Sequence, residues 1–175
     1  LRITGIGGTG VVTVSQVLAT AASIGGLFVQ SLDQTGLAQK GGAVVSDLRL
    51  SPEPVARANY LGPGQADVYL ACDLLVAVTD ANLEAASPDR THAIISTTQV
   101  PTGAMVADPS VAYPELDVIL SRLSARMRSE RHVDARGLAL DLFADDHFAN
   151  VLLVGMAVQC GLLPLEPAHV EQALT

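Results

Sequence analysis

A glycine cluster near the start of the chain has the residue types and spacing of a ligand-binding turn. Gly5, Gly7 and Gly10 fit the pattern G-x-G-x-x-G, and Gly8 lies inside the same turn. Between a strand and a helix, Gly5 and Gly7 let the backbone turn tightly and approach a ligand. Gly10 is expected to let the helix pack close to the strand. The helix N-terminus then favours an anion such as phosphate, with the Thr9 hydroxyl as a further donor. The turn is therefore a candidate anion or nucleotide site.

An acidic residue strengthens this interpretation. Asp33 ends the predicted second strand, where dinucleotide-binding folds place the acid that binds the ribose hydroxyls. The alternative is a tight turn without a ligand, because any α/β domain needs one and the fingerprint alone is a weak signal. The residues leave both interpretations open.

A second candidate site is the loop that holds Lys40. This lysine lies between Gln39 and the pair Gly41 and Gly42. A lysine flanked by flexible backbone could reach a substrate carboxylate, a coenzyme A phosphate or an acidic group of a partner. The plain alternative is a surface lysine on a turn. We expect an interface or active-site-lining role for these four residues.

The remaining acidic residues predict local structure rather than chemistry. Asp145, Asp146 and His147 resemble a metal-binding triplet, but an aspartate at this place is expected to cap the following helix. Asp73 and Asp80 are likewise expected to be turn or cap residues. We predict no metal site and no catalytic residue in this chain.

The two cysteines, Cys72 and Cys160, are far apart and lie in apolar stretches. We expect buried, reduced thiols, which suits a cytoplasmic protein. An iron–sulfur cluster generally needs four thiolates, so this chain cannot hold one by itself.

Hydrophobic periodicity and turn residues define the elements that must position these sites. Strands are expected at 1–5, 27–33, 43–51, 66–73, 91–97 and 132–135, and helices at 9–25, 74–88, 114–130, 136–144, 150–161 and 166–174. The first strand, helix and second strand form a β-α-β unit around the glycine turn. Alternating strands and helices predict an α/β class, as a three-layer α/β/α Rossmann-like domain with a mainly parallel sheet that could be mixed. Residues 1–175 are expected to form one domain.

Composition excludes several classes of function. The net charge is −8 and aromatic residues make up 3% of the chain, whereas nucleic-acid binders carry basic patches and stacking aromatics. No apolar run reaches the ~18 residues of a membrane span. Hydrophobic residues make up 49% of the chain, and Leu1 already lies in a strand-like run. Both features predict a piece of a longer chain or assembly, and self-association stays open.

A family resemblance follows from the order of these motifs. The turn "GIGGTGVVT", a strand ending in Asp33, and the loop "GLAQKGG" leading into a strand resemble the gamma domain of the 2-oxoacid:ferredoxin oxidoreductases. The loop sequence is most like the indolepyruvate ferredoxin oxidoreductase branch. The segments "ADVYLACDLLVA" and "ANVLLVGMAVQCGLLPL" are similar to the same branch, so the resemblance covers nearly the whole chain.

The resemblance implies a function that the spacing of residues does not. These enzymes oxidatively decarboxylate 2-oxoacids, aryl pyruvates in the indolepyruvate branch, on thiamine diphosphate with Mg²⁺, and they pass electrons through [4Fe-4S] clusters to ferredoxin. The gamma part is a separate subunit or is fused into a longer chain, and the cofactors belong mainly to other parts. We therefore expect a domain that contributes to assembly and to the surroundings of the active site, inactive alone. A free-standing nucleotide-binding module and a pure oligomerisation domain are the alternatives.

Overall fold

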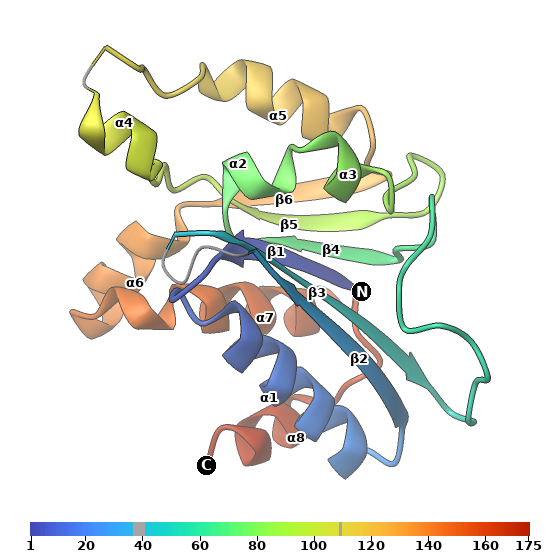
Figure 1. The fold of residues 1–175 in the computed structure, drawn as a ribbon. Helices are drawn as coiled ribbons and strands as arrows, with labels where there is room; N and C mark the ends of the chain where they lie inside the picture. The colour runs from blue at the N-terminus through green and yellow to red at the C-terminus, as the bar shows by residue number, and fades with distance from the viewer. Residues whose placement is uncertain (37–40, 109) are drawn as a thin grey trace.

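The computed structural model describes residues 1–36, 41–108 and 110–175, and its centre is a mixed sheet (Figure 1). The strands in the described residues are β1 (Arg2–Ile6), β2 (Phe28–Thr35), β3 (Ala43–Ser51), β4 (Val68–Ala71), β5 (His92–Ser96) and β6 (Ser129–Val133). Their order across the sheet is β2-β3-β1-β4-β5-β6. The α/β class and the mainly parallel, mixed sheet are confirmed, because β1, β4, β5 and β6 pair in parallel.

The antiparallel strand is β3, which lies between β1 and β2 and runs opposite to both. The predicted β-α-β unit exists, since β1 and β2 run in the same direction, but its two strands are not neighbours. The chain folds back after β2 and inserts β3 into the gap. Strand order of this kind depends on tertiary pairing, which the hydrophobic pattern of single strands does not report.

Helices cover both faces of the sheet (Figure 1). One face carries α1 (Val11–Ile24), α7 (Ala149–Gln159) and α8 (Pro167–Ala173), and the other carries α2 (Leu74–Ala77), α3 (Asp80–Leu83) and α5 (Leu116–Ser124). Two further helices, α4 (Gly103–Ala107) and α6 (Ala135–Phe143), and the 3₁₀ turn η1 (Asp146–Phe148) lie toward one end of the sheet. The three-layer architecture is therefore confirmed, with one hydrophobic core on each face.

The predicted helix over 74–88 is wrong, because the structure has two one-turn helices there. Asp73 caps α2 through a hydrogen bond from the Val76 N–H, as expected for a cap residue. The carbonyl of Val76 then accepts hydrogen bonds from the Thr79 hydroxyl (3.1 Å) and the Asn82 amide (2.7 Å). Short polar side chains that bind nearby backbone groups compete with a continuous helix, and the helix breaks at this point.

The predicted helix over 114–130 and the strand over 132–135 also shift. The helix α5 ends at Ser124, and β6 already begins at Ser129. The carboxylate of Asp134 accepts a hydrogen bond from the Gly137 N–H and starts α6, so the strand ends earlier than the sequence indicates. Ser129 and Glu130, the last residues of the predicted helix, thus begin an edge strand.

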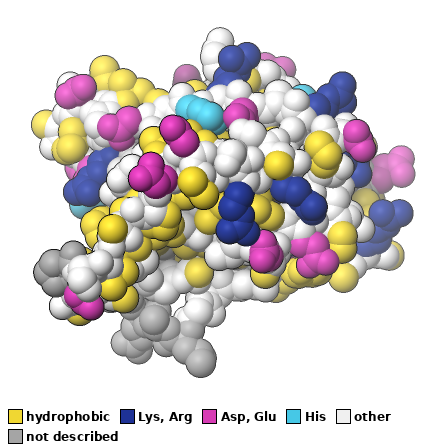
Figure 2. Space-filling view, turned by 90° about the horizontal axis from the view of Figure 1, so that it is seen from above, with side chains coloured by type: hydrophobic (Ala, Val, Ile, Leu, Met, Phe, Trp, Pro, Cys, Tyr) yellow, Lys and Arg dark blue, Asp and Glu magenta, His cyan; other side chains and the backbone are white. Residues whose placement is uncertain are grey.

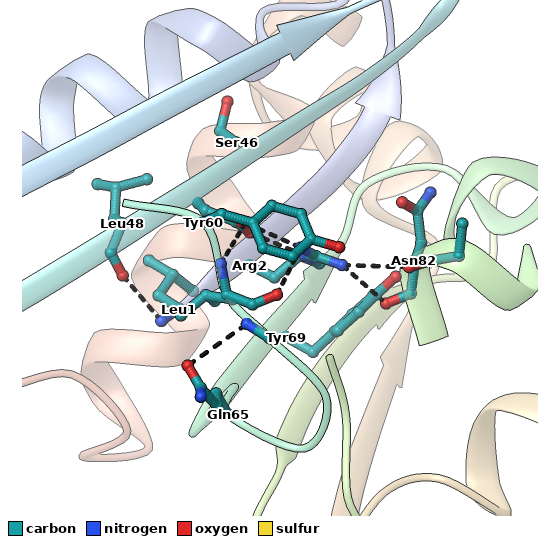
Figure 3. A network of polar contacts seen from close by, with 12 residues as sticks. Leu1, Arg2, Ser46, Leu48, Tyr60, Gln65, Tyr69 and Asn82 are labelled. Carbon is teal, nitrogen blue, oxygen red and sulfur yellow. Dashed lines mark hydrogen bonds and ion pairs between the residues drawn. The ribbon is translucent and has the colours of Figure 1, made fainter. Parts of the chain in front are cut away.

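A buried ion pair joins the amino end of β1 to its neighbours (Figure 3). The Arg2 guanidinium donates two hydrogen bonds of 2.8 Å to the Asp47 carboxylate on β3. It also donates to the carbonyl of Asn82 at 3.2 Å and lies 5.6 Å from the centre of the Tyr60 ring. Both charged side chains are almost fully buried, so their mutual hydrogen bonds compensate for the loss of water. This network fixes the end of the sheet opposite to the glycine turn.

Among the described residues, no helix is both long enough and apolar enough to cross a membrane.

Candidate functional site

The candidate sites predicted from the sequence meet at one edge of the sheet. The carboxyl ends of the parallel strands β1, β4, β5 and β6 lie at the same edge. Because β2 runs parallel to β1, the end of β2 at Thr35 and the start of β3 at Ala43 lie there as well (Figure 1). We call this the carboxyl edge. Open α/β sheets bind ligands at this edge, where the strand order reverses.

The glycine that allows close packing of strand and helix is Gly5. A Cβ atom built on Gly5 would lie 2.5 Å from Cγ2 of Val11 and 3.2 Å from Cβ of Cys72. A Cβ on Gly10 would meet no described atom within 4 Å. The expectation that Gly10 serves helix packing is therefore wrong. Gly10 precedes α1 with a φ of 88°, a left-handed conformation that favours glycine.

The start of α1 offers unpaired backbone donors. The first N–H groups of a helix have no intrahelical acceptor, and the first helical bond here runs from the Val14 N–H to the Gly10 carbonyl. Gly8 also has a positive φ of 90° and open space where a side chain would be. The Thr9 hydroxyl does not add a donor to this group, because it donates to the Ile6 carbonyl at 2.7 Å. The expectation for Thr9 is thus corrected.

Asp33 does not end its strand, which continues to Thr35. Its Oδ1 accepts hydrogen bonds from the hydroxyls of Ser46 on β3 (2.6 Å) and Ser15 on α1 (3.4 Å). Both serines are buried. The aspartate therefore ties β2 to the second turn of α1, and one oxygen that a ribose would need is engaged within the protein.

The loop predicted to carry Lys40 borders the glycine turn directly. The Gly7 N–H donates to the Gly42 carbonyl at 2.8 Å, and the Gly36 N–H donates to the Ala43 carbonyl at 3.0 Å. The first bond holds one end of the loop against the turn, and the second joins the two ends of the loop to each other. Gln39 and Lys40 lie outside the described residues. Gly41 and Gly42 lie at the carboxyl edge, and their role at an interface or active site stays a prediction.

Two cavities flank the glycine turn. The larger, of about 510 Å³, lies against the start of α1 and reaches Val44 on β3. The smaller, of about 300 Å³, lies between the turn and the ends of β4 and β5. Its polar lining comes from separate elements: Thr9, Asp73, Ser96, Thr98, Arg136, Asp146, His147 and Asn150. This volume falls at the low end of small-molecule sites.

Asp73 is the most unusual group in the smaller cavity. Its residue is 2% exposed, and Oδ2 has no hydrogen-bond partner among the described residues. Burial raises the pKa of this carboxyl, and hydrogen bonds from the backbone at Val76 and Leu75 oppose the rise. Within the described ranges the Tyr113 hydroxyl is also buried without a partner, and burial, together with the charge of Asp73, raises its pKa to about 12. The unpartnered Oδ2 of Asp73 can bind a polar ligand atom in this cavity, whereas Tyr113 is not among its lining residues.

Asn150 connects the turn to the helix α7. It is 7% exposed, and its amide donates to the Thr9 carbonyl at 2.7 Å. Neither Asp73 as a cavity group nor Asn150 was predicted from the sequence. The available signals were an aspartate directly after a buried strand and an asparagine at the start of an otherwise apolar helix.

Asp145, Asp146 and His147 do come together, with ligand atoms within 4.8 Å of one another. Their hydrogen bonds are those of a helix start: Asp145 accepts from the His147 N–H at 2.9 Å. The capping role is confirmed for Asp145. Asp146 pairs with Arg136 at 2.7 Å, so a cation here would compete with an existing positive charge.

The cysteines do not fit an iron–sulfur cluster. Cys72 follows β4, and burial raises the pKa of its thiol to about 12. Cys160 follows α7 and is exposed, so the expectation of burial is wrong for this residue, and Cys72 is only partly buried. Two thiols from separate elements do not supply the four thiolates that such a cluster takes.

The comparisons with known proteins agree with this architecture. The family of pyruvate ferredoxin/flavodoxin oxidoreductases matches residues 1–175. The indolepyruvate oxidoreductase subunit IorB of Archaeoglobus fulgidus is 31% identical over 98% of this chain and 82% of its own. The gamma subunit of a keto/oxoacid ferredoxin oxidoreductase from Geobacter sulfurreducens has the same fold, with a TM-score of 0.63 and 19% identity over 99% of this chain and 82% of its own.

A longer solved chain contains the fold as well. It is the 2-oxoglutarate:ferredoxin oxidoreductase from Magnetococcus marinus, solved with 2-oxoglutarate, coenzyme A and succinyl-CoA bound. The TM-score is 0.71 at 17% identity, over 99% of this chain and 26% of that one. The present chain belongs to the pyruvate ferredoxin/flavodoxin oxidoreductase family, as a gamma-type subunit of a 2-oxoacid:ferredoxin oxidoreductase.

Proposed function

We propose that this subunit serves an indolepyruvate-type enzyme, which oxidatively decarboxylates aryl 2-oxoacids and passes the electrons to ferredoxin. The observation that carries the proposal is the nearly full-length match to a subunit named for indolepyruvate. The role proposed for the chain is to complete the assembly and to line the surroundings of the active site, in the cytoplasm.

The chemistry of the described residues supports a lining role rather than a reacting one. The carboxyl edge offers backbone donors at the start of α1, hydroxyls, one arginine and a buried carboxyl. Thiamine diphosphate with Mg²⁺ and the [4Fe-4S] clusters are proposed to reside in partner subunits, where thiamine diphosphate supplies the decarboxylation chemistry. Residues of this chain then shape the edge of that site and limit its access to water.

The loop at 36–42 is the proposed point of contact with the partner. Lys40 is the only lysine of the chain, so an amine-reactive reagent labels this side chain alone, apart from the terminal amine. We expect labelling of Lys40 to fall at least tenfold when the enzyme assembles. Equal labelling in the free chain and in the assembled enzyme would place the loop outside the interface.

Coenzyme A is the anion to test first at this edge. A solved relative with this fold carries it, and the free N–H groups at the start of α1 suit a phosphate. Titration calorimetry on the assembled enzyme measures this. Binding that weakens when Gly8 is replaced by alanine supports a phosphate at the turn, and unchanged binding contradicts it.

The function itself is tested by leaving the chain out. The assembled enzyme, the partner subunits alone and this chain alone are each given indolepyruvate, phenylpyruvate, pyruvate and 2-oxoglutarate, with methyl viologen as electron acceptor. We expect dye reduction only by the assembled enzyme and preferentially with the aryl pyruvates. Turnover by this chain alone, or a preference for pyruvate or 2-oxoglutarate, would contradict the proposal.

A free-standing nucleotide-binding module is the second candidate. It is favoured by the open space at Gly8 and Gly10 beside the start of α1. The engagement of Asp33 by Ser15 and Ser46 counts against it. Micromolar binding of NAD, NADP or FAD to this chain alone, lost on Asp33→Ala, would favour this candidate over the first.

A further inference from the structure

The helix α6 has an unusual distribution of apolar side chains. Of its nine residues, Ala135 and Ala139 are buried, whereas each leucine and phenylalanine of the helix remains exposed. Leu142 is 60% exposed and Phe143 is 52% exposed. A helix that is apolar on most of its sides is normally covered on those sides. The protein has placed the small residues of α6 inward and the large ones outward.

The turn after α6 extends the same apolar surface. The rings of Phe143 and Phe148 pack with their centroids 5.1 Å apart. Between the two phenylalanines, Ala144 ends the helix with a φ of 55°, a left-handed conformation that costs an alanine about 1–2 kcal/mol. The ion pair between Arg136 and Asp146, at 2.7 Å, ties the turn back to the helix. The surface is thus held in shape by defined contacts.

We define the α6 surface by its exposed apolar side chains: Leu138, Leu140, Leu142, Phe143 and Phe148. These are five of the twelve large hydrophobic side chains that are exposed in the described ranges, although the segment spans only 138–148. Clustered exposed apolar residues mark interaction sites more often than scattered ones do. Figure 2 shows hydrophobic side chains gathered toward the left of the view, the carboxyl edge of Figure 1, and Lys and Arg side chains mostly toward the right.

The charges around the α6 surface select the occupant. Asp141 lies among its leucines, and Asp145 and Asp146 lie at its end. The cationic groups of the segment are Arg136, which pairs with Asp146, and His147, which pairs with Asp145. In a symmetric dimer the same patch would face itself, so these acidic rims would repel each other. A partner with an apolar centre and a basic rim has no such penalty. The net charge of −8 on this chain favours the same kind of partner.

We infer that the α6 surface docks onto an apolar, basic-rimmed surface of a partner subunit of the same oxidoreductase. The inference rests on the proposed function, because it requires that such a partner exists. The α6 surface would be a second contact with the partner, in addition to the proposed contact at the loop at 36–42. Helix α6 begins at the carboxyl edge, where β6 ends. The cavity lined by Arg136, Asp146 and His147 lies beside α6, so docking would cover it.

The test measures the affinity of the full chain for its purified partner subunit by biolayer interferometry. Leu142→Glu and Phe143→Ser each remove a candidate anchor of the interface, and truncation of such anchors typically weakens binding ~30-fold or more. Val118→Glu is the matched control, since Val118 is 56% exposed on α5, which covers one face of the sheet and lies away from α6 in Figure 1. We expect the control to bind like the wild type. Equal binding by all three variants overturns the inference.

A substitution of an exposed charge tests the same inference without the risk that the variant fails to fold. Asp141 is exposed on α6 and can change without disturbing a core. We expect Asp141→Lys to keep the circular dichroism spectrum, to slow association several-fold and to reduce the dependence of association on salt. Faster association would show that the partner's rim is acidic and would overturn the inference.

Two outcomes separate this inference from the proposed function. If the wild-type chain fails to bind the partner subunit, the proposed function fails and the inference fails with it. If the wild type binds and supports dye reduction, but the α6 variants do so equally well, only the inference fails. Concentration-dependent dimerisation of the chain alone that Leu142→Glu abolishes, seen by sedimentation velocity, would assign the surface to a second copy and contradict the inference.

Discussion

Replacing Gly5 by alanine tests how the glycine turn is built. The new methyl group would lie 2.5 Å from Cγ2 of Val11 and 3.2 Å from Cβ of Cys72. Ordinary contacts between such carbons are about 3.5–4.0 Å. Val11 is 2% exposed and packs in the core on one face of the sheet. Helix α1 must therefore move away from β1, or Val11 must leave its rotamer.

The magnitude follows from overpacking. Forcing an extra methyl into a packed core costs about 1–3 kcal/mol of unfolding free energy. For a chain of this size each kcal/mol lowers Tm by about 2–4 °C, so Gly5→Ala is expected to lower Tm by about 2–12 °C. Thermal unfolding followed by circular dichroism measures this, with urea unfolding as an independent scale.

A double-mutant cycle attributes the cost to the Val11 methyl. Val11→Ala removes Cγ2 and by itself costs about 2 kcal/mol, through lost burial and a small cavity. In the double variant the new methyl on residue 5 fills part of that space. We expect the destabilisation of the double variant to be about 1–2 kcal/mol smaller than the sum of the two single-variant destabilisations. Additivity within about 0.5 kcal/mol would refute the packing explanation.

Gly8 provides the matched control. Its φ is 90°, and a Cβ there meets no described atom within 4 Å. Gly8→Ala is therefore expected to cost about 1–2 kcal/mol through backbone strain alone. That cost should be unaffected by Val11→Ala. Rescue of Gly8→Ala by Val11→Ala would show that the two glycines are not distinguished as the structure indicates.

Three further substitutions test other parts of the structure. Arg2→Met leaves Asp47 buried without its partner, so it should lower the free energy of unfolding by about 3–5 kcal/mol, measured by thermal unfolding. Adding Asp47→Leu in the same chain should recover most of this loss. A loss below about 1 kcal/mol would contradict the burial of the pair. Asp73→Asn keeps an acceptor for the cap but does not titrate. Burial raises the pKa of the Asp73 carboxyl above its ordinary value of 3.8. The folded wild type therefore holds this proton more tightly than the unfolded chain does, and it loses stability as pH rises from about 4 through the folded pKa. The asparagine variant should be relatively more stable at pH 7 than at pH 4, and the opposite trend in urea unfolding would refute this. Ala144→Gly relieves the left-handed φ of 55° and should raise the unfolding free energy by up to about 1 kcal/mol, whereas a loss would argue that the alanine methyl packs.

The periodicity of the sequence predicted α1 and the class of the fold because both depend on local pattern. Val11, Val14 and Leu18 recur at helical spacing and are all buried on one face of α1. The position of β3 between β1 and β2 could not be predicted in this way. It depends on which strands pair, and any strand with one apolar face fits several neighbours.

The site shows the same division between local and long-range information. The positive φ of Gly10 agrees with a turn that needs glycine. Asp33 was expected to bind a ligand, but Ser46, thirteen residues further along the chain, takes its carboxylate. Asn150 reaches the turn from 141 residues away. Such contacts form only after the sheet and its helices have assembled, so spacing in the sequence does not reveal them.

Hydrogen exchange of the chain, free and in the assembled enzyme, tests most directly whether the carboxyl edge joins the oxidoreductase. Peptides that cover 5–13, 36–44 and 135–148 are predicted to exchange more slowly after assembly. Peptides from α3 and α5, on the face of the sheet away from α1, should not change. Protection of α3 and α5 without protection of the carboxyl edge, or protection of the glycine turn by NAD in the chain alone, would contradict the account.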